Sequence, residues 1–337
     1  MDGEVDYPVK NLIAFDALEN PTWRTKDSSS QNATVEIMIS EIMKYHERWS
    51  KEQSEYDKKL IEEVKDKFFL EFITHVNREE EHGFSTLEET TNVLRNYVSD
   101  FGLRRSQSTE EKETINLEKA YIYLLGKIQR EEESGDYGLL EVSLLEETHR
   151  IILEDIPPPA KDYTKPGQFS NRRRIAEFKG EIYEYQKPED MKTAVNNLLD
   201  KYNFLFDSCT KNGLKSSADY YSLFKICAWL LFELLDLHPF SDGNGRLCRI
   251  LCSYSLSSFT PFPTPIYNVW TNSSKDDYKQ ALVDTRKIYN RYPRPLTTMI
   301  IECSYYGWRN FFKELDEKRT TSNRALEKES TTKSKEE

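Results

Sequence analysis

The sequence predicts an all-α fold, a helical bundle that carries one small β-hairpin. Apolar residues recur at helical spacing through most of the 337-residue chain. Residues 223–237 are apolar nearly all round, which is typical of a helix at the buried centre of a bundle. Only residues 167–185 show a convincing β pattern, in which apolar residues flank Lys179-Gly180 as they would flank the turn of a hairpin.

Four segments are expected along the chain. Residues 1–32 have no sustained period and are predicted to be irregular. Residues 33–74 combine apolar stripes with Glu- and Lys-rich faces, which predicts an N-terminal extension of two long helices, paired as a hairpin. Residues 75–312 are expected to form the main helical domain. Residues 318–337 are charged and polar with almost no apolar content, which predicts a disordered tail.

The main domain contains several further helix signals. Ser143 and Glu146 match a capping box, and the helix they would begin must end before Pro157. The helix at 223–237 is followed by a Gly-containing turn and then by a further helix at 246–256. The remaining predicted helices cover residues 87–98, 114–130, 195–206 and, as a final pair, 275–312.

The composition excludes some classes of function. A formal net charge of −11 argues against a nucleic-acid-binding protein, because phosphate contacts need clustered Lys and Arg. No stretch reaches the roughly 18 apolar residues of a membrane span, and the N-terminus lacks the features of a signal peptide. Five cysteines are an odd count without metal-ligand spacing, which points to a reducing compartment, the cytoplasm or the nucleus. Cys248 and Cys252 admit a metal pair, but small buried residues are the favoured reading.

The segment HPFSDGNGRLCR, residues 238–249, predicts a phosphate-binding site. Gly243 and Gly245 can adopt positive φ and let backbone amides approach an anion at the start of the following helix. Arg246 and Arg249 are three residues apart, so they share a helix face, and each guanidinium matches phosphate oxygens.

The same segment supplies a metal ligand and a base. Asp242 is well placed to hold a divalent cation such as Mg²⁺, with phosphate oxygens completing its coordination. His238 precedes the glycines and could take a proton from an attacking hydroxyl. The alternative is a capped helix–turn–helix corner in which His238 is a buried structural residue.

These twelve residues match the signature H-x-F-x-[DE]-G-N-G-R-x-x-R at every defined position, so the chain resembles the Fic family. Fic enzymes mostly transfer AMP from ATP to a Ser, Thr or Tyr hydroxyl of a target protein. The resemblance implies that His238 is the base and that Asp242 holds Mg²⁺ or Mn²⁺. Tyr278 falls where the family has a nucleotide-contacting tyrosine, although a core tyrosine is the alternative. The phosphate-binding residues implied are Gly243, Asn244, Gly245, Arg246 and Arg249.

The resemblance extends over about residues 75–312. Residues 145–150 are similar to the helix that precedes the family's flap, and His149 is expected to have a structural role there. Residues 166–169 resemble its P-G-x-[FY]-R entry, except that Ser170 replaces the arginine. The hairpin at 167–185 corresponds to the flap, whose edge holds the target as an added strand would.

Many Fic proteins also carry an inhibitory motif, [ST]-x-x-x-E-[GN], whose Glu pairs with the second signature arginine. Residues 77–82 resemble a degenerate version in which Glu81 is the inhibitory residue, with Asn77 and His82 departing from the pattern. The alternatives are a solvated acidic helix end, a second match at 114–118 and a third ending in Glu19-Asn20.

The resemblance therefore implies a protein adenylyltransferase that uses ATP and a metal ion, docks a protein substrate on its flap, and contacts neither nucleic acid nor membrane. A homodimer is one assembly open to it. Removal of AMP, transfer of another phosphate-containing group and a non-catalytic adaptor remain the alternatives.

Overall fold

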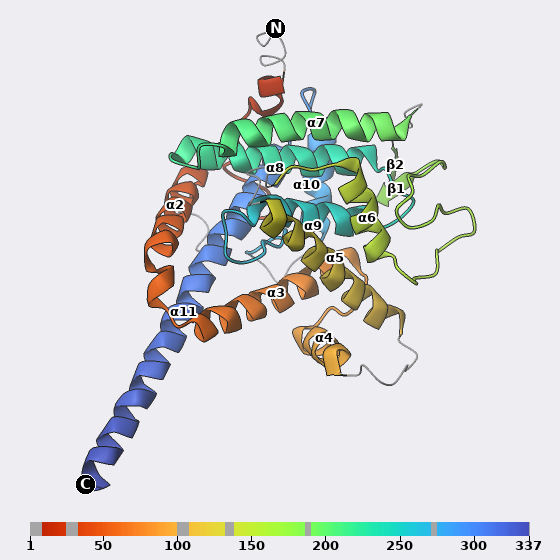
Figure 1. The fold of residues 1–337 in the computed structure, drawn as a ribbon. Helices are drawn as coiled ribbons and strands as arrows, with labels where there is room; N and C mark the ends of the chain where they lie inside the picture. Colours follow the sequence, from red (N-terminus) through yellow and green to blue (C-terminus); the bar gives the residue numbers. More distant parts are fainter. Residues whose placement is uncertain are drawn as a thin grey trace.

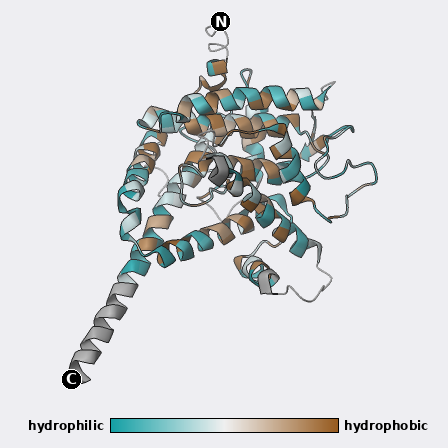
Figure 2. Cartoon of the chain, in the orientation of Figure 1, coloured by the Kyte–Doolittle hydropathy of each residue, from teal (hydrophilic) through white to brown (hydrophobic). Residues whose placement is uncertain are grey.

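Helix α8 (Ser217–Leu237) lies at the centre of the bundle, as its apolar sequence predicts. It begins with a capping box in which the Ser216 hydroxyl and the Asp219 carboxylate each bond to the other residue's backbone N–H. Helices α7, α9, α2 and α11 all pack against it. In Figure 2 the hydrophobic residues gather in the middle of the bundle and the hydrophilic ones on its outer helices. The predicted all-α bundle is confirmed.

The computed structural model describes residues 9–24, 33–99, 108–131, 138–185, 190–270 and 275–336. Figure 1 shows the arrangement of the helices and of the one hairpin in this part of the chain. Besides α8, the elements are η1 (Asn11–Ile13), α2 (Val35–Glu52), η3 (Gln53–Glu55), α3 (Lys58–Glu80), α4 (Leu87–Ser99), α5 (Thr109–Glu131), α6 (Val142–Ile152), β1 (Ile175–Phe178), β2 (Glu181–Glu184), α7 (Met191–Thr210), α9 (Asn244–Leu256), α10 (Lys275–Lys287) and α11 (Arg294–Glu336).

The two long N-terminal helices predicted are present as α2 and α3, but they are not paired as a hairpin, because each packs on α11 rather than along the other. Thr34 caps α2 and Asp57 caps α3, each by accepting hydrogen bonds from backbone N–H groups of the first turn. Both helices pack on α11, and α3 also packs on α5 and α9. The predicted boundary between residues 74 and 75 falls inside α3. This helix begins in the N-terminal extension, and its C-terminal end lies against α9.

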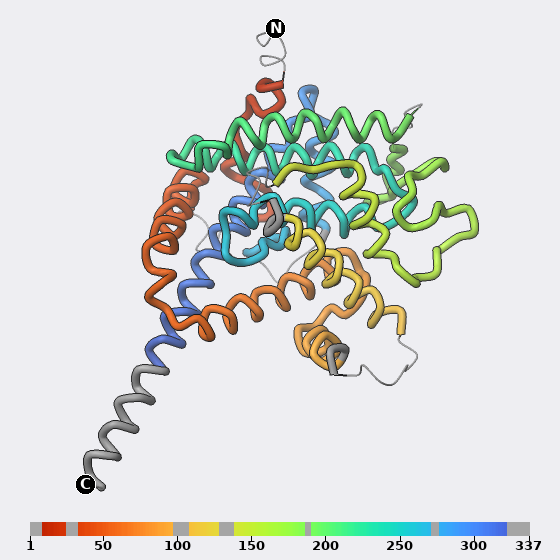
Figure 3. The backbone as a smooth tube through the Cα atoms, viewed as in Figure 1, coloured from red at the N-terminus to blue at the C-terminus, as the bar shows by residue number. Residues whose placement is uncertain are grey.

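The hairpin of β1 and β2 is antiparallel and pairs Phe178 with Glu181. Its two turn residues, Lys179 and Gly180, have φ angles of 52° and 80°, the left-handed backbone of a tight hairpin turn. Figure 3 shows the hairpin at one edge of the bundle, beside the C-terminal end of α8. The β prediction is therefore confirmed, and the hairpin lies next to the loop that carries residues 238–243.

Two local predictions need correction. Helix α6 has no capping box, because its N-cap is Glu141 and the Ser143 hydroxyl donates to the Glu141 carboxylate instead. The disordered tail expected from Lys318 is wrong at its start, because α11 continues through this residue and Lys318 pairs with Glu63 at 2.9 Å. Side chains beyond residue 321, like residues 1–8 and 25–32 of the expected irregular segment, lie outside the described residues.

Cys248 and Cys252, the pair considered for a metal, are free thiols buried in the core. Nowhere in the described ranges do three or more His, Cys, Asp or Glu side chains gather as a metal site would require. Among the same residues, no helix has both the length and the apolar character needed to cross a bilayer.

Candidate active site

The loop between α8 and α9 is held in shape by one buried amide side chain. Asn244 is 2% exposed, and its Oδ1 accepts a hydrogen bond from the Phe240 N–H at 3.0 Å. Its Nδ2 donates to the Phe240 carbonyl at 2.9 Å. Phe240 is fully buried, as expected for a residue that anchors the loop in the core. Asn244 therefore has a loop-shaping role beside the phosphate contact that the resemblance implies.

Helix α9 begins at a glycine-lined anion site. Gly243 is the N-cap, with a φ of 72° that favours glycine. The first backbone N–H groups of a helix have no partner within the helix and attract negative charge. A Cβ added to Gly245 would lie 1.9 Å from Oε2 of Glu80, so the absence of a side chain lets this carboxylate approach the backbone. An anionic group thus lies against the first turn of α9, in the environment predicted for phosphate.

Arg246 is the most unusual group of the site. Its side chain is 1% exposed, yet Nε, Nη1 and Nη2 have no hydrogen-bond partner in the described part of the chain. The carboxylate of Glu113 lies 3.6 Å from Nη1, which is an ion pair without a hydrogen bond. Burial lowers the pKa of Arg246, because the charged form loses its hydration. A buried guanidinium without bonds is costly, and phosphate oxygens are the groups that its fork matches.

Arg249, one turn further along α9, donates hydrogen bonds through two of its nitrogens. Its Nε donates to Oε1 of Glu80 at 2.6 Å, and its Nη1 donates to the Ile266 carbonyl. Burial works to lower the pKa of Arg249, but the Glu80 carboxylate outweighs it and the net shift is upward. The guanidinium carbon lies 4.0 Å from the ring centroid of Tyr278. Tyr278 therefore packs beneath Arg249, and its contact with a nucleotide stays a prediction.

His238 lies at the end of α8 with its imidazole stacked on the ring of Tyr185. The ring centroids are 3.9 Å apart and the planes are within 10°. Nδ1 lies 3.3 Å from the Leu235 carbonyl, so this nitrogen carries the proton and Nε2 is left as the basic atom. Burial, with a smaller contribution from Arg174, lowers the pKa of His238 to about 4. The imidazole is therefore neutral near pH 7 and able to accept a proton.

Comparison with known proteins agrees with this geometry. Residues 139–256 match the model of the Fic/DOC family. A Fido domain-containing protein of Dictyostelium discoideum is 30% identical over 135 residues, which cover 39% of this chain and 84% of that protein. This chain belongs to the Fic (Fido) family. The match includes the signature loop, so the resemblance to Fic proteins predicted from residues 238–249 is confirmed.

Solved Fic structures share the fold over most of the chain. A Fic domain-containing signaling protein of Bacteroides thetaiotaomicron is 20% identical with a TM-score of 0.63, and the likeness covers 83% of this chain and 97% of that one. Fic-1 of C. elegans is 16% identical with a TM-score of 0.60, covering 84% of this chain and 73% of that one. The architecture is thus the Fic fold.

The acid that meets the second signature arginine is Glu80, which corrects the prediction of Glu81. Helix α3 ends at Glu80, and Glu81 is its C-cap with a left-handed backbone, φ 59°. Gly and Asn, the residues that close the Fic inhibitory pattern, are those that favour this backbone. Aligning the pattern on its left-handed position puts Glu81 in the Gly/Asn place and Glu80 in the Glu place. Asn77, which suggested the other register, instead donates to the Thr114 hydroxyl at 3.0 Å.

The other two matches to the inhibitory pattern serve the packing of helices. The Thr114 hydroxyl accepts hydrogen bonds from Asn77 and from the Phe84 N–H, so it holds the end of α3 on α5. Glu19 accepts a hydrogen bond from the Val35 N–H at the start of α2. Neither segment supplies the carboxylate that pairs with Arg249.

A second acid, Glu113 on α5, faces the signature loop and was missed by sequence reasoning. Its Oε2 accepts a hydrogen bond from the Gly83 N–H at 2.7 Å, and its Oε1 lies 2.8 Å from Nδ1 of His82. Burial works to raise the pKa of Glu113, but these two bonds and Arg246 lower it overall. Glu113 therefore ties the segment that follows Glu80 to the first signature arginine. Its position more than 30 residues from His82 leaves no local pattern to detect.

The entry to the flap departs from the family pattern, and the structure shows what replaces it. Ser170, in place of the arginine, accepts a hydrogen bond from the Ser241 hydroxyl at 3.2 Å, and its N–H donates to the Pro239 carbonyl. Arg174, four residues later, reaches the signature loop and donates to the carbonyls of Leu237 and His238. Because His238 has a φ of 48°, these bonds stabilise a backbone conformation that non-glycine residues rarely adopt.

His149 has the structural role expected of it. Its Nδ1 accepts a hydrogen bond from the Gly167 N–H at 2.8 Å, so its Nε2 carries the proton and donates to the Asp242 carbonyl at 2.9 Å. Its ring stacks on Phe240 with a centroid distance of 3.8 Å. Burial lowers the pKa of His149 to about 4, which keeps it neutral. His149 therefore joins the flap entry to the loop that carries Asp242.

Asp242 is partly exposed beside the anion site. Its Oδ1 accepts a hydrogen bond from the Gly243 N–H at 2.7 Å. One carboxylate is a typical protein contribution to a Mg²⁺ ion that also binds substrate phosphates. The donor set therefore fits a metal that arrives with a nucleotide, and does not resemble an all-protein metal cage.

Proposed function

We propose that this Fic protein is an adenylyltransferase that moves AMP from ATP to a Ser, Thr or Tyr hydroxyl of another protein. The observation that carries the proposal is the buried guanidinium of Arg246 in the first turn of α9, which has no hydrogen bond in the described chain and follows a neutral histidine, His238, by eight residues. Such a pair joins an anion-binding group to a general base, and that combination suits phosphoryl-group chemistry.

The phosphates of ATP would bind along the first turns of α9. Backbone amides from Gly243 to Gly245 would receive the α-phosphate, and Arg246 and Arg249 the β- and γ-phosphates. Asp242 would hold the Mg²⁺ or Mn²⁺ ion, which supplies charge neutralisation between phosphates when bound. The two guanidinium groups stabilise the negative charge that develops on the leaving pyrophosphate, and they do so in a buried site where such stabilisation is strongest.

The chemical step uses Nε2 of His238. This nitrogen takes the proton of the target hydroxyl as the hydroxyl oxygen forms a bond to the α-phosphorus. The bond from that phosphorus to the oxygen bridging to the β-phosphate breaks, and pyrophosphate leaves with the electron pair. The proton stays on the imidazole until solvent removes it. A positioned base of this kind contributes about 10²- to 10⁴-fold in rate.

The flap would present the hydroxyl to this base. Both strands of the hairpin are short, and a two-stranded sheet leaves an open edge on each side that can accept an added strand. The second strand leads directly into Tyr185, which is stacked on His238. A target segment that pairs with the hairpin would therefore lie next to the imidazole.

Glu80 would regulate the site by competing with ATP. Its carboxylate bonds to Arg249 and lies against Gly245, which are the groups proposed to receive phosphates. ATP can bind productively only when this carboxylate is displaced. We infer that the basal activity of the enzyme is low and that release of the end of α3 raises it.

The deciding experiment uses ATP labelled on either the α- or the γ-phosphate. With Mg²⁺ and cell lysate, transfer of the α-label to protein is expected from a Glu80→Gly variant and, more weakly, from the wild type. The variant Glu80→Gly combined with His238→Ala is the control, and it should bind ATP within a few-fold of its parent but transfer no label. Transfer of the γ-label instead, or α-label transfer that survives His238→Ala, would rule out this function.

A further inference from the structure

A single buried carboxylate joins the flap to the helix that carries the base. Asp236 is 3% exposed and lies in the last turn of α8, two residues before His238. Its Oδ1 accepts hydrogen bonds from the Tyr183 hydroxyl of β2 at 2.8 Å and from Nε of Arg286 of α10 at 2.9 Å. Its Oδ2 accepts one from Arg291, in the turn between α10 and α11. Three separate parts of the chain therefore meet at one side chain.

The charges at this point favour a permanent connection. Burial works to raise the pKa of Asp236, but the bonds from Arg291 and Tyr183 outweigh it and lower the pKa overall. The carboxylate is therefore ionised at neutral pH and faces two guanidinium groups. Removing its charge would take from Arg286 and Arg291 the carboxylate that they share and leave only the charge of Glu233 near Arg291, which is costly in a buried setting.

Aromatic rings continue the connection as far as the base. The guanidinium carbon of Arg286 lies 3.9 Å from the ring centroid of Tyr183 and 5.4 Å from that of Tyr185. Tyr185 in turn stacks on the imidazole of His238 at 3.9 Å. The imidazole is thus fixed between its bond to the Leu235 carbonyl and the flat face of a flap residue. Apart from His238, none of these groups belongs to the signature.

We propose that Tyr183, Tyr185, Asp236, Arg286 and Arg291 form a base clamp, in which Asp236 and Tyr185 are positioning residues that keep the second flap strand in register with His238. The inference rests on the proposed function, because it assumes that the flap presents a hydroxyl to this imidazole. The physical reason is geometric, since displacing reacting groups by about 1 Å costs on the order of 10²-fold in rate. The target is held by one element and the base by another, and the clamp sets the distance between them.

The clamp makes a specific kinetic prediction for Asp236→Asn. Loosening β2 from α8 should lower kcat for transfer by about 10- to 100-fold, the range expected for lost orientation. The dissociation constant for ATP should stay within about twofold, because the three hydrogen-bond partners of Asp236 include none of the residues proposed to bind phosphates. Tyr185→Leu, which removes the stacked ring, should behave in the same way. Tyr185→Phe keeps the ring and should restore most of the activity.

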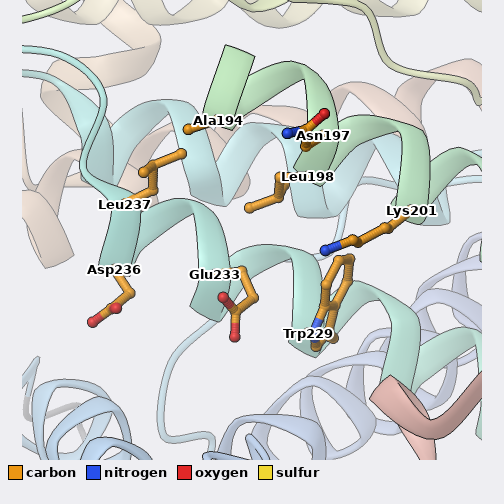
Figure 4. Close-up of a pocket in the computed structure, with 8 residues that line it drawn as sticks. All are labelled: Ala194, Asn197, Leu198, Lys201, Trp229, Glu233, Asp236 and Leu237. Carbon is orange, nitrogen blue, oxygen red and sulfur yellow. The ribbon is translucent and has the colours of Figure 1, made fainter. Parts of the chain in front are cut away.

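Glu233→Gln is the matched control. Figure 4 shows Glu233 and Asp236 one turn apart on α8, with both carboxylates projecting from the same side of the helix. Glu233 lines the groove between α7 and α8 with Lys201 and Trp229. Its charge interacts with those of Arg291 and Asp236, but the flap hydroxyl of Tyr183 bonds to Asp236 and not to Glu233. Removing this carboxylate should leave kcat and flap exchange unchanged. A loss of activity equal to that of Asp236→Asn would show that any acid removed from this turn has the same effect, and would overturn the proposal.

Amide hydrogen exchange tests the clamp without relying on transfer. In Asp236→Asn, exchange should become faster at residues 181–185 and 235–238 than in Glu233→Gln, while the centre of α9 is unchanged. If Asp236→Asn does not fold, Tyr183→Phe can be used instead. It removes one hydroxyl that donates to the Asp236 carboxylate and should show the same changes in exchange to a smaller degree. Unchanged exchange and unchanged kcat in these variants would overturn the clamp. Faster exchange in a protein whose wild type transfers no AMP would support the clamp and reject the proposed function instead.

Discussion

The last turn of α3 and the first turns of α9 approach the same anion site with opposite charge. Helix α9 contributes Gly245, Arg246 and Arg249, which lie within five residues of one another. Helix α3 contributes one carboxylate, Glu80, from 169 residues away in the sequence. Arg249, to which this carboxylate bonds, is hydrogen-bonded through two of its nitrogens, whereas Arg246, to which it does not bond, has no hydrogen bond in the described chain. On the proposed function, the residues that bind the nucleotide therefore lie close together in the sequence, whereas the residue that regulates binding reaches the site through a tertiary contact.

The largest expected effect comes from removing the metal ligand on the α9 side. Asp242→Ala should lower transfer by roughly 100-fold or more, because a metal ion supplies several kcal/mol of charge stabilisation. The remaining activity should no longer respond to Mg²⁺ concentration. Rates measured across a Mg²⁺ titration check this. The control is Asp162→Ala, which removes an exposed acid from the loop between α6 and β1. Unchanged Mg²⁺ dependence in Asp242→Ala would contradict the assignment.

A large effect of opposite sign should come from the α3 side. Glu80→Gly should raise transfer and ATP affinity by roughly 10- to 100-fold, since a hydrogen bond to a charged group contributes about 1.5–3 kcal/mol. Glu81→Gly is the matched control, because it deletes a neighbouring carboxylate at a position whose left-handed backbone suits glycine. Auto-modification and ATP binding measured for both variants decide whether Glu80 or Glu81 is the inhibitory residue. An increase in Glu81→Gly alone would restore the original assignment of the inhibitory residue.

A smaller effect is expected from the second acid. Glu113→Gln removes the charge that lies 3.6 Å from Arg246 but keeps an oxygen that can accept the Gly83 N–H. Because no hydrogen bond joins the two groups, ATP affinity should rise only about two- to fivefold, the range of a modest ion pair. Calorimetric titration with a non-hydrolysable ATP analogue measures it. An effect as large as that of Glu80→Gly would mean that the two acids restrain the site equally.

The smallest expected effect is the response of the rate to moderate acid. The neutral form of His238 is the base, and its pKa is lowered from 6.5 to about 4, so the rate at saturating ATP should stay level from pH 8 to pH 6. It should fall only as the pH drops through the folded pKa. Acid should lower the folding stability here, which is the opposite of its effect on a histidine whose charged form is stabilised by the fold. The unfolded chain binds this proton below pH 6.5 and the native chain does not, so the melting temperature should fall with pH over this window, and by less in His238→Ala. An acid limb centred near 6.5 would contradict the buried neutral base.

The sequence was sufficient wherever structure depends on neighbouring residues. The apolar run of α8 and the turn at Lys179-Gly180 are local features, and both were predicted from spacing and residue type. The signature loop is also local, since its arginines, glycines and histidine lie within twelve residues. Local chemistry could also mislead. The Ser143 hydroxyl had a nearer acceptor than a helix N–H, and a charged segment rich in helix-forming residues continued α11.

Contacts between distant segments could not be predicted in this way. Glu80 was missed by one residue because the pattern was aligned on Asn77 rather than on the backbone conformation at Glu81, which only the structure shows. Glu113 and Arg174 reach the signature residues from α5 and from the flap entry, and Asp236 joins the end of α8 to the flap. Nothing in their local sequence distinguishes these three residues from surface charges. The bundle positions these residues, and a single sequence does not reveal which charged side chains turn inward.

Gly245 has a consequence for how such an enzyme could escape its own restraint. The space that lets a phosphate oxygen approach α9 is the same space into which the Glu80 carboxylate fits, and any side chain at 245 would fill it. A substitution at Gly245 would therefore prevent both the Glu80 carboxylate and the ATP phosphate from binding. A tethered group also competes at a fixed local concentration, on the order of millimolar for a short connection, which no dilution lowers. On the proposed mechanism, ATP binds only above a concentration that is set by its competition with Glu80. A change in the position of α3 would change that concentration.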